Sequence, residues 1–357
     1  HGRLHWNRLF DAGIALAQDG FAIGGRLADA IAGTRTFLQT DREAARYFLD
    51  SDGAAKSLGT VLRNPAYAAT LRALASHGAD ALHSGAIAEG ILEKIHKTSG
   101  GSPTVAMTPG LTAMQDLRSY RAIRRDPVCT TYRQYWICGM GPPSSGGMTV
   151  ASAMGILENF DLANLKVDGV DSQHLQIEAM KLAFADVYRY VAEPSAMEVT
   201  PAQMLDPAYL RQRAQLIDMN RAQNFGAGNP VKGGTIYLST ADENGMMVSF
   251  IQSNYMGFGS GCVEPNFGIS LQNRGHGFSL NAQGLNPANL VAPGKRPFHT
   301  IIPAFLSKDG QPVMSYGVMG ANMQPQGHMQ TLVRMLDYGQ NPQAACDAPR
   351  WRYNAGF

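Results

Sequence analysis

Residues 224–240 read NFGAGNPVKGGTIYLST and join two different parts of the chain. Up to Gly234 this stretch has four glycines and almost no apolar bulk, which is typical of an exposed, mobile loop. From Thr235 onward β-prone residues follow, so a strand is expected to begin there. The residues before the loop carry mostly helical patterns. The chain is therefore expected to have a helix-rich first part and a strand-rich second part.

An Asn-Gly pair (244–245) lies between two β-prone runs that follow this loop. Such a pair between two strands is the strongest short-range signal for a β-hairpin. If the turn has two residues and no bulge, the register places Thr235 opposite Asn254, with Ser253 beside it.

Two helices can be placed by their ends. An Asn-Pro pair (64–65) predicts an N-cap and a first helical residue, and Gly78 predicts the end of that helix. The longest helical pattern runs over residues 173–190, with Asp171 or Ser172 as the expected cap.

The position of Thr235 after two glycines can be interpreted in two ways. Taken alone, glycines before a threonine that opens a strand are a common structural feature. The chemical reading is more specific, because a threonine hydroxyl becomes a useful nucleophile when the residue's own free α-amine removes its proton. That arrangement requires cleavage between Gly234 and Thr235, and glycines permit the strained backbone geometry that such a step needs.

Composition excludes several classes of protein. The 357 residues are 45% hydrophobic and can fill the core of one large domain or two ordinary ones. Thirty basic and 28 acidic side chains leave a charge of only +2, so nucleic acid is not an expected partner. The longest charge-free runs are broken by proline and glycine, so no membrane span is expected. The cysteines are far apart without a C-x-x-C pair, which predicts buried free thiols at Cys129, Cys138, Cys262 and Cys346.

Familiar cofactor motifs are absent. The run Gly257–Gly261 lacks the third glycine of a dinucleotide fingerprint, and Arg296 stands where a phosphate-binding loop needs serine or threonine. Neither G-x-S-x-G nor H-E-x-x-H occurs. No metal or organic cofactor is implied.

Several separated motifs, taken together, resemble the γ-glutamyltranspeptidase family. They are PPSSGG (142–147), LENFDL (157–162), EAMKLAFAD (178–186), TIYLSTAD (235–242), GFGSG (257–261), APGKRP (292–297) and DAPR (347–350). The resemblance implies an α+β fold, the αββα sandwich of N-terminal-nucleophile hydrolases. It also implies autocatalytic cleavage of a zymogen into a large-subunit-like segment (1–234) and a small-subunit-like segment (235–357). The two fragments would form one intertwined domain and stay associated.

Site residues follow from the same resemblance, position by position. Thr235 would be the nucleophile, Ser253 the hydroxyl that orients its freed amine, and Gly320 and Ala321 the backbone donors of the oxyanion hole. The implied substrate-binding positions are Asn254, Tyr255, Arg274, His299 and Thr300.

This chain departs from the family pattern around the substrate's head group. Gly277 stands where the family has an aspartate that binds the α-amino group, and His299-Thr300 replaces a pair of serines. The pattern resembles a branch of the γ-glutamyltransferases that overlaps in sequence with cephalosporin acylases. Arg274 is expected either to bind a substrate carboxylate or to be an ordinary surface arginine.

The function implied is hydrolysis or transfer at γ-glutamyl amide bonds of glutathione-like compounds, with water or an amino acid or peptide as acceptor. One alternative is an acylase for glutaryl-type side chains, and another is a truncated, non-catalytic remnant. Compared with the family, the chain is expected to be shortened at both ends. The sequence indicates no compartment, and the resemblance suggests either a bacterial periplasmic or secreted location or a cytoplasmic one.

Overall fold

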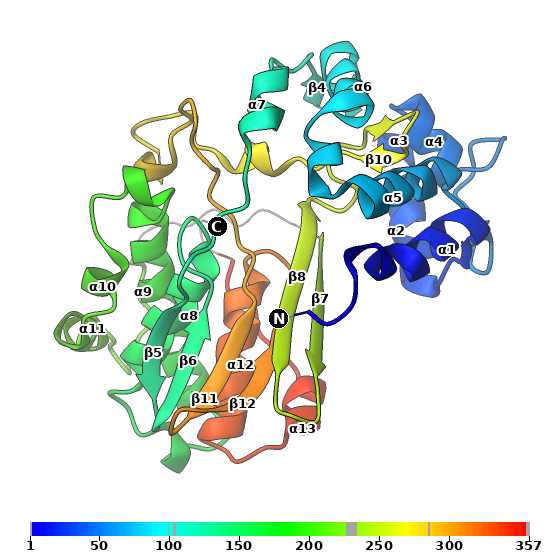
Figure 1. Ribbon diagram of the computed structural model, residues 1–357. Helices are drawn as coiled ribbons and strands as arrows, with labels where there is room; N and C mark the ends of the chain where they lie inside the picture. The colour runs from blue at the N-terminus through cyan, green and yellow to red at the C-terminus, as the bar shows by residue number, and fades with distance from the viewer. Residues whose placement is uncertain (1, 99, 103–104, 226–233, 285, 355–357) are drawn as a thin grey trace. The chain divides into compact units, whose positions relative to one another are not determined.

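The computed structural model describes residues 2–98, 100–102, 105–225, 234–284 and 286–354 (Figure 1). These residues form two compact units, and each unit combines two stretches of the chain. The first unit contains residues 1–123 and 257–273, and the second contains residues 124–256 and 274–357. Most of the glycine-rich loop predicted at 224–234 lies outside the described residues. Within the described ranges, no helix has the length and apolar composition needed to cross a bilayer.

The first unit is mainly helical. Its α-helices are α1 (Asp11–Asp19), α2 (Gly25–Gly33), α3 (Arg35–Leu38), α4 (Arg42–Phe48), α5 (Pro65–His77), α6 (Gly85–Lys97) and α7 (Met114–Ser119), with 3-10 turns at Trp6–Phe10 and Ala79–Leu82. Short antiparallel strand pairs join β1 (Phe21–Ala22) to β2 (Val61–Leu62), β3 (Gly100–Ser102) to β4 (Val105–Met107), and β9 (Val263–Glu264) to β10 (Ile269–Ser270). A small core of Ile23, Ile31, Leu38, Ala44, Leu49 and Val263 holds the unit together.

Helix α5 has the ends predicted from the sequence. The Asn64 side chain accepts a hydrogen bond from the Tyr67 N–H (3.0 Å), Pro65 is the first helical residue, and Gly78 ends the helix with φ +80°. The longest predicted helix is also present, but it begins earlier, at Val170, after an N-cap at Gly169.

The second unit is built on a four-stranded antiparallel sheet in the order β12-β11-β6-β5. These strands are β5 (Val128–Tyr132), β6 (Tyr135–Gly139), β11 (Ala304–Lys308) and β12 (Gln311–Tyr316). Helix α8 (Ser145–Leu157) packs against β5 and β6. Three further helices pack on α8, namely α9 (Val170–Tyr190), α11 (Pro207–Ala214) and α12 (Met323–Leu336). The short helices α10 (Pro201–Met204) and α13 (Pro342–Asp347) contact α11 and α12, respectively (Figure 1). Short 3-10 turns lie at Leu162–Asn164, Pro194–Ala196, Arg274–Gly277 and Pro287–Asn289.

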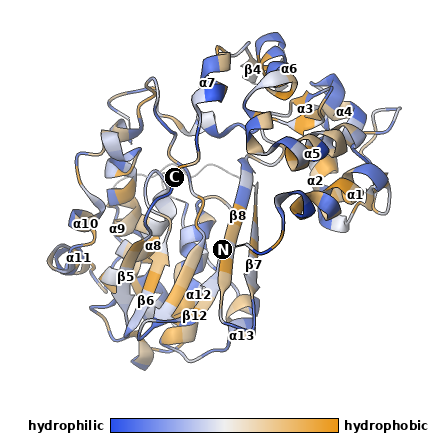
Figure 2. Ribbon diagram, viewed as in Figure 1, coloured by the Kyte–Doolittle hydropathy of each residue, from blue (hydrophilic) through white to orange (hydrophobic). Residues whose placement is uncertain are grey.

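A two-stranded hairpin, β7 (Gly234–Ala241) and β8 (Met247–Tyr255), completes the second unit. It lies beside the larger sheet, since the Ser239 and Ser315 hydroxyls are hydrogen-bonded and the Ala304 N–H donates to Ser249 Oγ at 3.0 Å. In Figure 2 much of β8 has the colour of hydrophobic residues, and its residues Val248 and Phe250 are about half exposed to solvent.

The predicted register of this hairpin is wrong by one residue over most of its length, because the turn has three residues rather than two. Gly245 adopts φ +81°, and the Asp242 N–H donates to the Met246 carbonyl (3.0 Å). The Asp242 carboxylate also accepts from the Asn244 and Met246 N–H groups, which favours the longer turn.

A bulge near the other end of the hairpin compensates for this shift. Ile236 pairs with Gln252, whereas Gly234 pairs with Tyr255. The backbone of Thr235 therefore lies opposite two residues of β8, Ser253 and Asn254.

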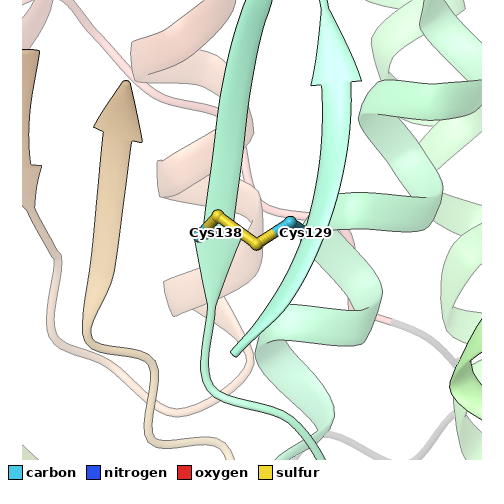
Figure 3. Close-up of a disulfide and its surroundings, with 2 residues drawn as sticks. All are labelled: Cys129 and Cys138. Carbon is cyan, nitrogen blue, oxygen red and sulfur yellow. A yellow bond between two sulfur atoms is a disulfide. The ribbon is translucent and has the colours of Figure 1, made fainter. Parts of the chain in front are cut away.

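The prediction of free thiols is wrong for one pair of cysteines. Cys129 on β5 and Cys138 on β6 are directly opposite in the register and form a disulfide (Figure 3). A tight turn at Arg133 and Gln134, with φ +47° and +70°, folds the two strands together. The sequence signal was weak because this turn has no glycine or asparagine. Cys262 is free and buried as expected, but free Cys346 is exposed.

Two glutamines on α12 bind the extended segment that follows α13. The side-chain amide of Gln326 donates to the Tyr353 carbonyl (3.0 Å) and accepts from the Tyr353 N–H (2.7 Å). Gln330 makes the same pair of hydrogen bonds with Trp351, at 3.0 and 3.1 Å. The two buried amides thus act on this segment as a neighbouring strand would.

Candidate active site

A cavity of about 250 Å³ opens in the second unit at the end of β8, where Tyr255 pairs with Gly234, the residue before the candidate nucleophile Thr235. It is lined by Tyr188, Tyr255, His276, Gly277, Phe278, Ser279, Asn286, Asn289, Phe298, His299, Thr300, Ala321 and Asn322. Four residues expected to form the site are among them, namely Tyr255, His299, Thr300 and Ala321. Gly277, where the family pattern has an aspartate, lines it too.

The serines of the PPSSGG motif fix the segment that carries His299 and Thr300. Ser145 donates to the His299 carbonyl through both its N–H (2.8 Å) and its hydroxyl (3.0 Å), and Ser144 Oγ donates to the Ile301 carbonyl. No side chain fits at Gly146, where a Cβ would lie 2.0 Å from the Ile302 side chain. This motif therefore acts as a scaffold for the cavity wall.

Gly320 and Ala321 lie just before α12 with an unusual backbone. Both have positive φ, +121° and +51°, and the value at Ala321 is uncommon for a residue with a side chain. Their carbonyls accept from the Met323 and Gln324 N–H groups (2.9 and 3.0 Å). Within the described residues their own N–H groups donate no hydrogen bond. Two successive free N–H groups suit the binding of an oxyanion.

Tyr255, at the end of β8, connects the cavity to the hairpin. Its φ is +79°, its N–H donates to Ser253 Oγ (2.9 Å), and its register partner is Gly234. The Arg274 guanidinium lies 5.3 Å from the centre of the Tyr255 ring, and its Nη2 donates to the Ser253 carbonyl (3.4 Å). The fold thus brings Ser253, Tyr255 and Arg274 together. Among the described site residues, Ser253, Asn254, Arg274 and Gly320 do not line the cavity itself.

The charge state of the wall follows from burial. Burial lowers the pKa of His299 to about 3, and the positive charges of Arg274 and Arg125 act in the same direction, so this imidazole is neutral at pH 7. Burial also lowers the pKa of Arg274 and raises that of Tyr255. The cavity lining has no carboxylate among the described residues.

Several residues of the cavity were missed from the sequence. Tyr188 and Phe298 stack with ring centres 5.5 Å apart. Buried Asn289 accepts from the Phe298 N–H (2.9 Å) and donates to the Gly277 carbonyl (2.6 Å), so it holds two parts of the wall together. Asn286 caps the turn that carries Asn289 (2.9 Å). The Asn-Pro pair at 286–287 is a capping signal that could have identified this turn.

Among the described residues, no three His, Cys, Asp or Glu side chains cluster in a way that could hold a metal ion.

Comparison with known proteins places the chain in a family. The family model for γ-glutamyltranspeptidase matches residues 1–356. The glutathione hydrolase proenzyme of Escherichia coli is 30% identical over 99% of this chain and 61% of its own length. The oxamate amidohydrolase proenzyme of Klebsiella pneumoniae is 34% identical over 96% of this chain and 62% of its own length. The chain thus spans less than two thirds of these relatives.

Solved structures confirm the fold class. The cephalosporin acylase from Bacillus halodurans superposes with a TM-score of 0.84 at 39% identity, over 100% of this chain and 63% of that protein. The fold is therefore α+β, of the N-terminal-nucleophile hydrolase type. Family match, relatives and fold agree: the chain belongs to the γ-glutamyltranspeptidase family of enzymes.

Proposed function

We propose that this chain belongs to a self-processing threonine amidohydrolase whose preferred acyl group carries a terminal carboxylate and no α-amino group, as a glutaryl group does. The observation that carries the proposal is the lack of any carboxylate in the described lining of the cavity. The sequence favoured a γ-glutamyl substrate and kept a glutaryl substrate as the alternative. The cavity favours the alternative.

The reasoning rests on the cost of burying charge. A γ-glutamyl group carries an ammonium, which loses much free energy when it leaves water unless a carboxylate receives it. The family's aspartate is replaced by Gly277, and the Tyr255 hydroxyl lies only 3.9 Å from the point where a Cβ on Gly277 would stand. A phenol does not replace the charge of a carboxylate.

Positive charge near the cavity favours an anionic acyl group. Arg274 lies against the Tyr255 ring, and the charges of Arg274 and Arg125 both act on His299. Arg125 is paired with Glu193 (2.6 Å), so the argument rests on Arg274, whose charge attracts a substrate carboxylate and repels an ammonium. The structural similarity to a cephalosporin acylase supports the same choice.

The proposed reaction begins with cleavage between Gly234 and Thr235. The freed α-amine then takes the proton of Thr235 Oγ, which attacks the substrate carbonyl, while Ser253 orients the amine. The N–H groups of Gly320 and Ala321 bind the oxyanion. The C–N bond breaks as the α-ammonium returns its proton to the leaving amine, and water then hydrolyses the acyl-enzyme. An amino acid or peptide acceptor would make the same step a transfer.

The test compares the kcat/KM values of the purified protein for glutaryl- and γ-glutamyl-p-nitroanilide. We expect the glutaryl compound to be preferred by at least about tenfold, because an unpaired buried ammonium costs more than 1.4 kcal/mol. Thr235→Ala should abolish both activities, and no Thr235-dependent hydrolysis of either compound would favour the non-catalytic remnant. A preference for the γ-glutamyl compound would restore the glutathione-like substrate, which the similarity to glutathione hydrolase supports.

A matched pair of glycine variants sharpens this test. Gly277→Asp places a carboxylate in the cavity wall and should shift the preference toward the γ-glutamyl compound, although its Cβ would stand only 3.0 Å from the Phe298 carbonyl oxygen. Gly275→Asp adds the same charge two residues away, where a Cβ would contact nothing, and should leave the preference unchanged. Equal shifts in both variants would show that overall charge, and not the wall of this cavity, sets the preference.

A further inference from the structure

We propose that Tyr255 is a positioning residue for self-cleavage, because its left-handed backbone creates the bulge that sets the peptide between Gly234 and Thr235. The inference rests on the proposed function, since it concerns the step that frees the nucleophile. The proposed role belongs to the backbone conformation of Tyr255. It is separate from the role of the Tyr255 ring, which lines the cavity.

The first observation is the conformation itself. Tyr255 has φ +79°, a region that L residues with bulky side chains rarely adopt. Residues held in such conformations persist only where their surroundings fix them, and they concentrate at functional sites. Tyr255 is only 8% exposed, so its neighbours are able to hold it.

The second observation is what holds this conformation. The Tyr255 N–H donates to Ser253 Oγ (2.9 Å), which closes a tight local turn. The Arg274 guanidinium lies over the Tyr255 ring at 5.3 Å and also donates to the Ser253 carbonyl (3.4 Å). Backbone, ring and guanidinium together fix Tyr255 in the strained region.

The third observation is the effect on the strand register. Between the pairs Ile236–Gln252 and Gly234–Tyr255, two residues of β8 stand opposite one residue of β7. A regular ladder would continue with Gly234 opposite Asn254. Because the extra residue lies in β8, the bulge changes which β8 residue stands opposite Gly234, so that Tyr255 takes the place of Asn254. The conformation at Tyr255 is thus coupled directly to the bond that is cleaved.

Three substitutions separate the backbone from the side chain. Tyr255→Gly keeps access to positive φ and removes the ring. Tyr255→Phe keeps the ring and removes the hydroxyl. Tyr255→Val removes the ring and also disfavours positive φ, because β-branched residues are the least tolerant of it. The control is Asp309→Val, at another non-glycine residue with positive φ (+51°), in the turn between β11 and β12.

The measurement is the rate of appearance of the fragment that begins with Thr235, followed by intact mass, with the thermal midpoint of each variant measured in parallel. We expect Tyr255→Phe and Tyr255→Gly to cleave within about threefold of the wild type, and Tyr255→Val to cleave about tenfold or more slowly. Asp309→Val should lower stability without slowing cleavage. The mature Tyr255→Gly enzyme should show a raised KM, since its cavity wall is lost.

The outcomes distinguish this inference from the proposed function. Equal slowing of the glycine and valine variants would mean that the ring and not the backbone matters, and would overturn the inference. If Tyr255→Val cleaved as fast as the wild type, the inference would also be overturned, but the proposed function would not be affected. A wild-type chain that is folded but never cleaves would overturn both.

Discussion

At the scale of single residues, the buried imidazole of His328 bears on the stability of the fold. It is fully buried on α12 beside the Tyr316 ring (4.9 Å between ring centres), and neither ring nitrogen has a hydrogen-bond partner within the described residues. Burial lowers the pKa of His328 to about 3, and the positive charge of Arg350 acts in the same direction. The folded protein therefore holds this imidazole neutral at pH values where an unfolded chain would protonate it.

This difference predicts a pH dependence of stability. The folded pKa lies below the unfolded value of about 6.5, so the unfolded state binds the extra proton and stability falls as the pH drops from about 6.5 toward 3. Between pH 7 and pH 5, we expect the wild type to lose about 2 kcal/mol more than His328→Leu. Urea unfolding at the two pH values measures this. Parallel losses in both proteins would contradict the expectation.

At the scale of elements, the sequence predicted those whose ends carry strong local signals. Helix α5 was placed correctly because Asn64, Pro65 and Gly78 each fix a backbone position. The β7–β8 hairpin was predicted, but its register was not, since an Asn-Gly pair is compatible with turns of different length. The disulfide was missed because the turn between β5 and β6 lacks the usual residues.

The residues of the candidate site were likewise predicted only in part from the sequence. His299, Thr300 and Ala321 were predicted by matching motifs position by position, and the fold brings them to one cavity. The aromatic and asparagine residues of that cavity were missed, because their roles depend on tertiary contacts between distant segments. Asn289, for example, matters because it binds both Gly277 and Phe298.

The glutamine pair on α12 gives a prediction at this scale. Gln326→Leu removes both hydrogen bonds to Tyr353 and leaves its N–H and carbonyl without those partners. We expect the free energy of unfolding to fall by about 1–3 kcal/mol, and the segment after α13 to become more sensitive to protease. Gln343→Leu, on the surface of α13, is the matched control and should have little effect. If Gln343→Leu lowered the free energy of unfolding by a similar amount, the effect would come from replacing glutamine with leucine and not from the lost hydrogen bonds to Tyr353.

At the scale of the whole molecule, the four-stranded sheet combines strands from both sides of the proposed cleavage point. Strands β5 and β6 precede Gly234 and strands β11 and β12 follow it, and β6 pairs directly with β11 over five residues. Helices α8 and α12, also from opposite sides, belong to one core. The disulfide lies wholly in the first fragment and does not connect the two.

The cleaved protein should therefore stay together without a covalent link. We expect both fragments to elute as one species in gel filtration, with or without a reducing agent, and to separate only in denaturant. Release of the smaller fragment by the reducing agent alone would contradict the pairing of β6 with β11.

Because β6 and β11 belong to different fragments, cleavage changes the molecularity of unfolding and refolding. Before cleavage, unfolding is a unimolecular event, and the midpoint of melting does not depend on protein concentration. After cleavage the same sheet can form only when two separate chains meet, so the midpoint should rise with concentration and refolding should become second order. Once diluted and unfolded, the mature protein would seldom recover, and its working lifetime would be governed by the rate at which β6 and β11 part.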